Sequence, residues 1–136
     1  MAIYKFRNCL LNTVERRVIK DGRYLAITPK TFDVLQMLVE SLGEIVTKDE
    51  MLGKVWNGSF IEEGNLPVHI SKLRVALGQT HNEHYIETSH GNGYRFVAQV
   101  ESVALEVWNQ QVSRKVKLRA SVELKKIDNP PNLWLI

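Results

Sequence analysis

The chain has 136 residues, of which 44% are hydrophobic, and its 18 basic and 15 acidic residues leave a net charge of +3. These values fit one globular domain with a tail. The single cysteine, Cys9, excludes an internal disulfide and fits a reducing, cytoplasmic setting. No stretch is long enough to span a membrane, and the first residues lack the apolar core of a signal peptide.

The charge balance allows a nucleic-acid partner without requiring one. Residues 1–100 hold 12 basic and 11 acidic residues. A DNA-binding surface in this region must therefore come from local clustering of basic side chains rather than from bulk charge.

The N-terminal part of the chain is typical of a small antiparallel sheet. Its short runs are rich in β-branched, aromatic and aliphatic residues, and Asp21-Gly22 is a strong hairpin signal. We expect three or four strands, over Ile3–Phe6, Cys9–Asn12, Arg17–Ile19 and Tyr24–Ile27.

A first helix is predicted from Thr28 to Gly43. Thr28 is a good N-cap, and Pro29 occupies the first helical position, where its missing N–H costs nothing. Gly43 is placed to end the helix in the left-handed conformation. The expected buried stripe consists of Phe32, Leu35, Val39 and Leu42.

A second helix is predicted from Thr47 to Trp56. Thr47 and Glu50 have the spacing of a capping box, in which each side chain satisfies the other residue's backbone donor. Its apolar side is expected to hold Met51, Leu52, Val55 and Trp56, and Asn57-Gly58-Ser59 ends it.

The third predicted helix, over residues 64–78, has two different faces. One carries a core-facing stripe of Leu66, Ile70, Leu73 and Leu77. The other has no acidic residue and suits a DNA major groove, because Lys can bond to guanine or phosphate, Asn to adenine, and Val can touch a thymine methyl. A solvated face that happens to lack acids explains this helix equally well when it is taken alone. The second face consists of Asn65, Val68, Ser71, Lys72 and Val75.

A hairpin is predicted from Tyr85 to Ala98. Two strand-like runs flank His90-Gly91-Asn92-Gly93, and the two glycines allow positive φ at the tip. A sheet, three helices and a closing hairpin, in this order, predict an α+β winged helix-turn-helix. In that fold the third helix enters the major groove, and the wing lies on the backbone or minor groove.

Four motifs in register resemble the OmpR/PhoB-type winged-helix DNA-binding domain of bacterial response regulators. They are ITPKTFDVLQMLV from Ile27, VTKDEMLGKVW from Val46, VHISKLRVALG from Val68 and YIETSHGNGYRF from Tyr85. The resemblance covers about residues 3–98. It implies an N-terminal antiparallel sheet, a three-helix core, a C-terminal β-hairpin wing over residues 88–95, and sequence-specific binding to promoter DNA, often by two protomers in tandem.

The resemblance also implies which residues bind DNA and which loop can touch RNA polymerase. Groove-reading positions are Asn65, Val68, Ser71 and Lys72. Backbone-contact and wing positions are His69, Arg74, Trp56, Thr88, His90 and Arg95. The polymerase-contact loop comprises Asn57, Gly58, Ser59, Phe60, Ile61, Glu62 and Glu63.

The chain departs from the family pattern in four ways. Ser71 and His90 stand where many relatives carry arginine, which removes one phosphate contact and weakens attraction at the wing tip. Pro67 occupies a position that is often acidic. No receiver domain precedes Met1, so the arrangement looks more like ToxR/CadC-type or stand-alone regulators, and control by phosphorylation in cis is not expected.

Two other classes of function remain as alternatives. A winged helix used for protein contacts, with little DNA affinity, is favoured by the weak basicity and by Ser71 and His90. An enzyme lacks support, since no catalytic, metal or cofactor constellation is found: His81 and His84 lack further ligands, and Cys9 has no neighbour that activates it.

Residues 101–136 are expected to form a β-hairpin extension or a linker beyond the domain at 1–100. The run from Lys115 to Lys125 alternates as a half-buried strand does, and Val103–Trp108 is expected to pair with it. A dimerisation edge is the alternative. The final apolar residues, Leu133 to Ile136, are compatible with a chain that continues into a membrane anchor.

Overall fold

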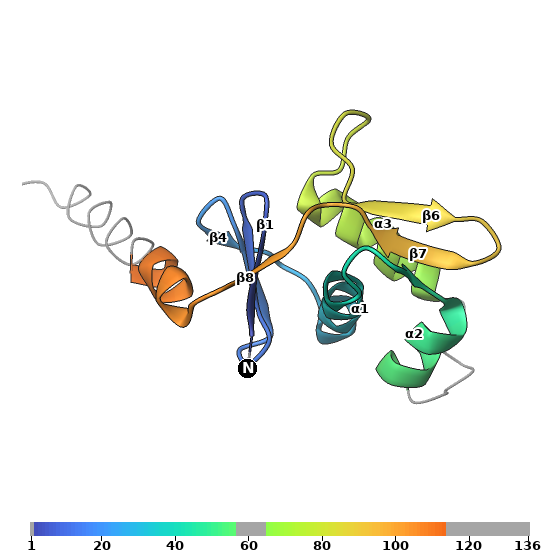
Figure 1. The fold of residues 1–136 in the computed structure, drawn as a ribbon, viewed down its shortest axis with the longest axis horizontal. Helices are drawn as coiled ribbons and strands as arrows, with labels where there is room; N and C mark the ends of the chain where they lie inside the picture. The colour runs from blue at the N-terminus through green and yellow to red at the C-terminus, as the bar shows by residue number, and fades with distance from the viewer. Residues whose placement is uncertain (1, 57–64, 114–136) are drawn as a thin grey trace, which may run out of the picture.

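The computed structural model describes residues 2–56 and 65–113. Within these residues, three labelled helices and a further helical segment over residues 105–113 accompany two antiparallel sheets (Figure 1). The larger sheet has the strand order β4-β3-β2-β1-β8, and the smaller has the order β5-β7-β6. The elements are β1 Ile3–Phe6, β2 Cys9–Asn12, β3 Arg17–Lys20, β4 Arg23–Tyr24, α1 Pro29–Glu40, β5 Ile45–Val46, α2 Lys48–Val55, α3 Leu66–Leu77, β6 Ile86–Ser89, β7 Gly93–Phe96 and β8 Glu101–Val103.

The predicted N-terminal sheet is confirmed, with a tight turn where the hairpin signal lies. Asp21 and Gly22 both have positive φ, 51° and 76°, and they join β3 to β4 through the pair Lys20 and Arg23. Two successive left-handed residues match the twist of the flanking strands. The fourth strand is shorter than predicted, because it ends at Tyr24 and the chain then runs to α1.

Both predicted N-caps are present. The Thr28 hydroxyl accepts a hydrogen bond from the Thr31 N–H at 3.3 Å, and the Thr47 hydroxyl accepts one from the Glu50 N–H at 3.1 Å. These bonds satisfy donors that have no partner within the helix itself. The two helices therefore begin where the local sequence predicts.

The left-handed conformation predicted for Gly43 is confirmed, but α1 ends earlier than predicted. The helix stops at Glu40 and is capped by Ser41, and the left-handed turn is made by Leu42 and Gly43, with φ of 54° and 84°. Leu42 was expected in the buried stripe, but it lies past the last helical residue and is 77% exposed. The 3.6-residue period holds only while the chain stays helical, so it cannot place a side chain in the following turn.

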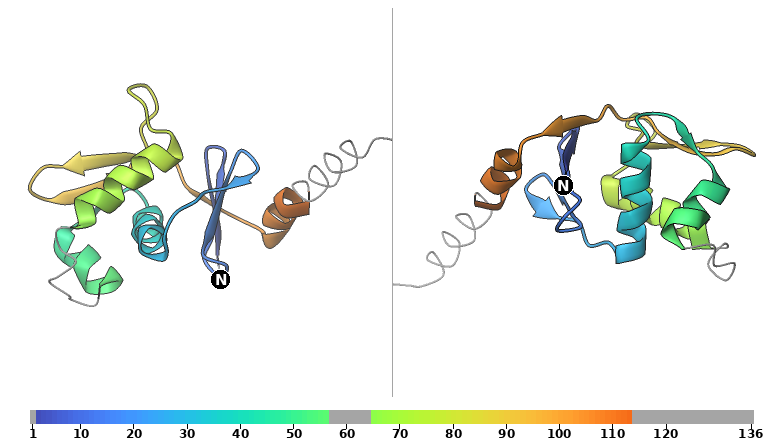
Figure 2. Two further views of the ribbon diagram at one scale, coloured as in Figure 1. Left: turned by 180° about the vertical axis from the view of Figure 1, so that it is seen from behind. Right: turned by 60° about the horizontal axis from the view of Figure 1, so that its bottom comes forward.

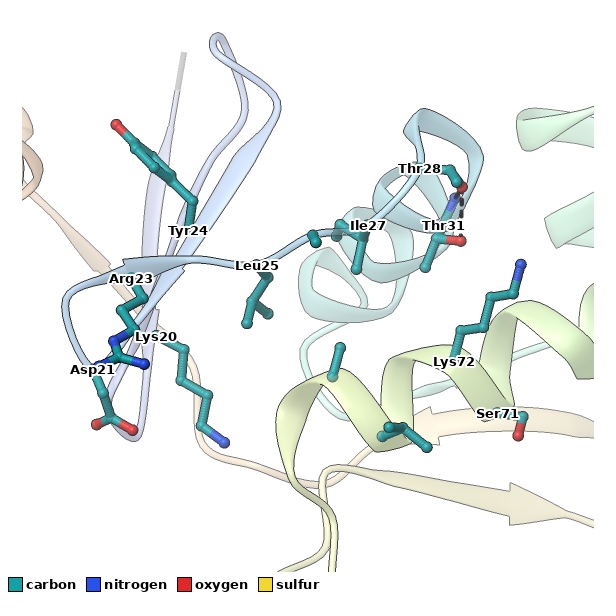
Figure 3. A pocket seen from close by; sticks show the side chains of 13 residues that line it. Lys20, Asp21, Arg23, Tyr24, Leu25, Ile27, Thr28, Thr31, Ser71 and Lys72 are labelled. Carbon is teal, nitrogen blue, oxygen red and sulfur yellow. Dashed lines mark hydrogen bonds between the residues drawn. The ribbon is translucent and has the colours of Figure 1, made fainter.

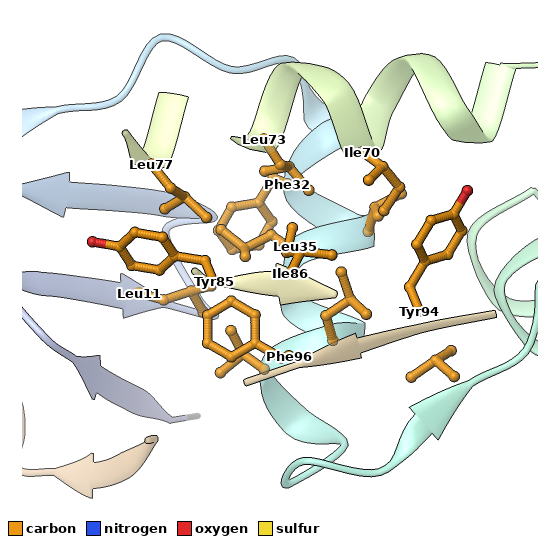
Figure 4. Packing of buried hydrophobic residues seen from close by; sticks show 14 of the residues in the cluster. Leu11, Phe32, Leu35, Ile70, Leu73, Leu77, Tyr85, Ile86, Tyr94 and Phe96 are labelled. Carbon is orange, nitrogen blue, oxygen red and sulfur yellow. The ribbon is translucent and has the colours of Figure 1, made fainter. Parts of the chain in front are cut away.

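One hydrophobic core joins α1 and α3 to the inner faces of both sheets (Figure 4). Phe6 of β1 meets Phe96 of β7 edge to face, with ring centroids 5.0 Å apart. Edge-to-face pairs of this kind add to the free energy gained from burial. This contact ties the wing sheet to the N-terminal sheet. The helix stripes that fill the core include Phe32, Leu35, Ile70, Leu73 and Leu77.

The outer face of the N-terminal sheet is covered by the segment that follows the wing. β8 pairs with β1, and the helical residues 105–113 then cross the sheet on the side opposite α1 (Figure 2). Trp108 is 2% exposed and packs with Ile3, Leu10 and Ile19. Residues 101–113 thus belong to the same packed unit as the rest of the domain.

The predicted strand over Val103–Trp108 is therefore wrong beyond Val103. A short apolar run fits a strand or a helix equally well, and here the apolar face of the sheet is covered by a helix that brings Val107, Trp108 and Val112 onto it. The proposed partner strand, residues 115–125, lies outside the described residues.

Candidate nucleic-acid interface

Helix α3 presents the two faces that its sequence predicts. Leu66, Ile70, Leu73 and Leu77 are buried. The helix ends at Gly78, whose φ of 76° is the left-handed conformation that glycine adopts without strain. The opposite face is exposed along its length, with Asn65, Val68, Ser71, Lys72 and Val75.

The groove-reading residues implied by the resemblance lie together on this exposed face. Val68 is 48% exposed, and Asn65, Ser71 and Lys72 are exposed as well. The side chain of Lys72 makes no hydrogen bond or ion pair with any residue in 2–56 or 65–113, so its charge is available to a partner. The structure therefore brings an amide, a hydroxyl, an ammonium group and an apolar side chain to one rigid helical surface.

His69 is tied to helix α1 instead of standing free beside these residues. Its Nδ1 lies 2.7 Å from the Oγ1 of Thr31, a residue that is 1% exposed. The imidazole also packs against Trp56, with ring centroids 5.5 Å apart. This half-buried histidine fixes the position of α3 relative to α1 and α2, a role that the sequence did not indicate.

Trp56 closes α2 and is 4% exposed. Its indole Nε1 is buried and has no hydrogen-bond partner among the described residues. Lys30 lies over the ring at 5.7 Å, and its ammonium group donates to the Val55 carbonyl at 2.7 Å. The predicted core role of Trp56 is confirmed, while its indole N–H does not reach the surface as a phosphate contact requires.

Arg74 and Thr88 are bonded to each other. The Arg74 Nη2 donates to the Thr88 hydroxyl at 2.8 Å and to the Ile86 carbonyl at 3.2 Å, and Nε donates to the same carbonyl at 3.3 Å. The guanidinium group thus anchors strand β6 of the wing to helix α3. Charge-assisted bonds of this kind are among the stronger hydrogen bonds in proteins.

Strand β7 of the wing carries Arg95 on the face away from the core. Its guanidinium group pairs with Glu87 of β6 at 3.3 Å, with side chains 43% and 55% exposed. An exposed pair of this kind contributes little to stability. It does reduce the positive charge that Arg95 offers to a phosphate.

The conformation of the wing tip requires glycine at position 93, for a reason that the sequence only partly indicates. Gly91 and Gly93 both have positive φ, 79° and 142°, as predicted. In addition, a Cβ built on Gly93 would lie 2.1 Å from the carbonyl oxygen of Val46, because β5 pairs with β7 at this point. His90 stands exposed at the tip.

Other candidate sites lack support in the described part of the chain. No group of three His, Cys, Asp or Glu residues there is placed to hold a metal ion. Burial raises the pKa of the Cys9 thiol to about 11, which keeps it protonated at neutral pH. No helix among these residues has the length and apolarity that crossing a membrane requires. The predicted polymerase-contact loop, Asn57 to Glu63, lies outside the described residues.

Comparison with known proteins identifies a family for this chain. The family model described as "Transcriptional regulatory protein, C terminal" matches residues 22–96. The transcriptional regulator HilA of Salmonella typhimurium is 36% identical over 93 residues, which are 68% of this chain and 17% of HilA. The phosphate regulon regulator PhoB of Pseudomonas aeruginosa is 35% identical over 88 residues, or 64% of this chain and 38% of PhoB. The chain thus spans well under half of either relative.

Solved structures share the fold. The DNA-binding domain of CpxR from Escherichia coli superposes with a TM-score of 0.63 at 26% identity, covering 73% of this chain and 99% of that domain. The RstA DNA-binding domain of Klebsiella pneumoniae, solved in complex with the RstA box, gives 0.60 at 28% identity, covering 70% and 96%.

Proposed function

The chain belongs to the OmpR/PhoB-type family of transcriptional regulatory DNA-binding domains, and on this premise we propose that it binds duplex DNA in a sequence-specific manner. Helix α3 enters the major groove, and the β6–β7 wing lies on the backbone or minor groove. The observation that carries the proposal is the acid-free exposed face of α3, with Asn65, Val68, Ser71 and Lys72 held on a helix whose other face is buried.

The chemistry of each side chain on the exposed face of α3 indicates which part of the DNA it contacts. Lys72 supplies charge for a phosphate or a guanine edge, Asn65 can pair with an adenine edge, and Val68 can contact a thymine methyl. Ser71 adds a hydroxyl in place of a charge. Affinity of one protomer is therefore modest, and two protomers on adjacent half-sites recover it by acting together.

The relatives support this proposal over a protein-interaction module. RstA, whose domain shares the fold, was solved with a DNA element bound, and HilA and PhoB are described as transcription regulators. We further propose that the loop Asn57–Glu63 contacts RNA polymerase where the chain activates transcription. This polymerase contact rests on the family resemblance alone.

The test is selection of bound sequences from a random duplex pool by the full chain at near-physiological salt, followed by deep sequencing. We expect an enriched motif repeated at a spacing near one helical turn, as a tandem pair requires. Lys72→Ala should abolish the enrichment while leaving the unfolding transition unchanged. Absence of any enriched motif with a folded wild-type chain would favour the protein-interaction reading instead.

A further inference from the structure

A groove runs between helix α3 and the β3–β4 hairpin (Figure 3). It encloses about 1010 Å³, and one of its walls is formed by Ser71, Lys72 and Val75. These three residues also belong to the exposed face of α3. The groove therefore continues the surface that the proposed function places in the major groove.

The groove carries a net positive charge. Lys20, Arg23 and Lys72 line it against one acidic residue, Asp21, whose carboxylate accepts a hydrogen bond from Asn8. Arg23 and Lys72 stand at opposite ends, with Lys20 between them (Figure 3). Lys20 is bonded to the carbonyl of Leu77.

Arg23 stands out because its charge is not used within the described part of the protein. Its side chain is exposed and makes no hydrogen bond or ion pair with residues 2–56 or 65–113. An arginine in this state offers several donors for an anionic group.

Most of the remaining lining is apolar, apart from the hydroxyl side chains of Thr28 and Thr31. Leu25 and Ile27 come from the segment between β4 and α1, and Val75 and Ala76 come from α3. Val75 is 80% exposed, an unusual degree for a valine on a helix packed into the core. A strand of DNA alternates anionic phosphates with apolar faces of deoxyribose, which matches cationic ends and an apolar floor.

We propose that this groove holds one phosphodiester strand at the edge of the major groove that α3 enters, and that Arg23 contacts a phosphate there. The inference rests on the proposed function and extends the DNA-binding surface beyond the helix-turn-helix and the wing, onto the β3–β4 hairpin. Both the charge of the groove and its continuity with the face of α3 favour DNA over other occupants.

The test compares Arg23→Ala with Lys5→Ala in the full chain, by fluorescence anisotropy with a selected duplex at several salt concentrations. Lys5 is an exposed cation on β1 that does not line the groove, so this variant is a control of equal charge change. Each phosphate contact contributes about 0.9 to the slope of log K against log salt. We expect Arg23→Ala to make the salt dependence shallower, with the magnitude of the slope reduced by about 0.9, and to weaken binding roughly eightfold at about 0.1 M salt.

The control should keep the wild-type slope, and Arg23→Lys should restore most of the lost slope because the charge remains. Urea unfolding of each variant verifies that the fold is intact. If the Arg23→Ala variant binds with the affinity and the salt dependence of the wild-type chain, this inference is overturned while the proposed function stands. Failure of the wild-type chain to bind any duplex contradicts the proposed function, and with it this inference.

A duplex with a single half-site separates DNA from a second copy of the chain as the occupant. If Arg23 contacts a phosphate, replacing Arg23 weakens binding to this single-site duplex as well. Loss that occurs only on a duplex with two half-sites would assign the groove to the neighbouring protomer and overturn the inference.

Discussion

The anchor between Arg74 and Thr88 allows a quantitative test of how the wing is held. Its shortest bond, from Arg74 Nη2 to the Thr88 hydroxyl, is 2.8 Å, and two further bonds reach the Ile86 carbonyl at 3.2 and 3.3 Å. Hydrogen bonds from charged groups stabilise proteins by about 1.5–3 kcal/mol, and partial solvent exposure places this anchor near the lower end. We expect Arg74→Ala to cost about 1.5–2 kcal/mol of unfolding free energy in the absence of DNA.

A double-mutant cycle isolates the contribution of the Thr88 bond. Thr88→Val keeps the shape of the side chain and removes only the hydroxyl. In urea unfolding followed by circular dichroism, the coupling energy between Arg74→Ala and Thr88→Val should be about 1–2 kcal/mol. The matched control is the exposed pair of Arg95 and Glu87, for which we expect a coupling between about 0 and 1 kcal/mol. Strictly additive effects of the first two substitutions would refute the anchor.

The same variants distinguish positioning of the wing from contact with phosphate. Thr88→Val removes no charge, so it should weaken DNA binding without changing the slope of log K against log salt. Arg74→Ala removes a charge, and a lower slope for this variant would show that Arg74 also contacts a phosphate. A lower slope for Thr88→Val would contradict a purely positioning role for its hydroxyl.

Four further outcomes are expected. Gly93→Ala should unfold the wing or the whole domain, because its Cβ would lie 2.1 Å from a β5 carbonyl oxygen, whereas Gly91→Ala, with nothing within 4 Å, should cost only about 1–2 kcal/mol for its positive φ; thermal unfolding compares the two. Trp108→Ala should cost about 3–5 kcal/mol in urea unfolding, since this side chain is 2% exposed in the apolar cluster on the sheet. His90→Arg should strengthen DNA binding at pH 7.5, and equal or weaker affinity would show that the tip does not approach the duplex. Burial raises the pKa of Cys9 to about 11, so the thiol should react with Ellman's reagent slowly in the native protein and rapidly in guanidinium, and stability should fall as pH rises from about 9 towards 11, where only the unfolded chain ionises readily.

The parts of the site that lie on a single helix were predictable. The stripe Leu66 to Leu77 and the exposed set around Lys72 follow from the 3.6-residue period of an α-helix, which depends only on residues within a few turns. The caps at Thr28 and Thr47 are equally local. The tertiary structure agrees with these predictions because the amphipathic pattern itself drives the packing.

The connections between elements could not be predicted in the same way. The bond from Arg74 to Thr88 joins residues that are 14 positions apart, and its form depends on the angle between α3 and the wing. The approach of Gly93 to β5 likewise requires β5 to pair with β7, although the partners Val46 and Tyr94 are 48 positions apart in the sequence. Neither leaves a periodic or motif signal in one sequence.

The sequence by itself thus determined the order of the N-terminal sheet, the three helices and the wing, and which side chains α3 buries or turns to solvent, because hydrophobic periodicity and capping act over short distances along the chain. Only the tertiary structure decided that the segment after the wing continues as β8 and a helix carrying Trp108 onto the sheet, and that Arg23 shares a groove with Lys72. Such choices depend on which apolar face remains uncovered and which surfaces meet once the chain has folded, and both are properties of the assembled domain.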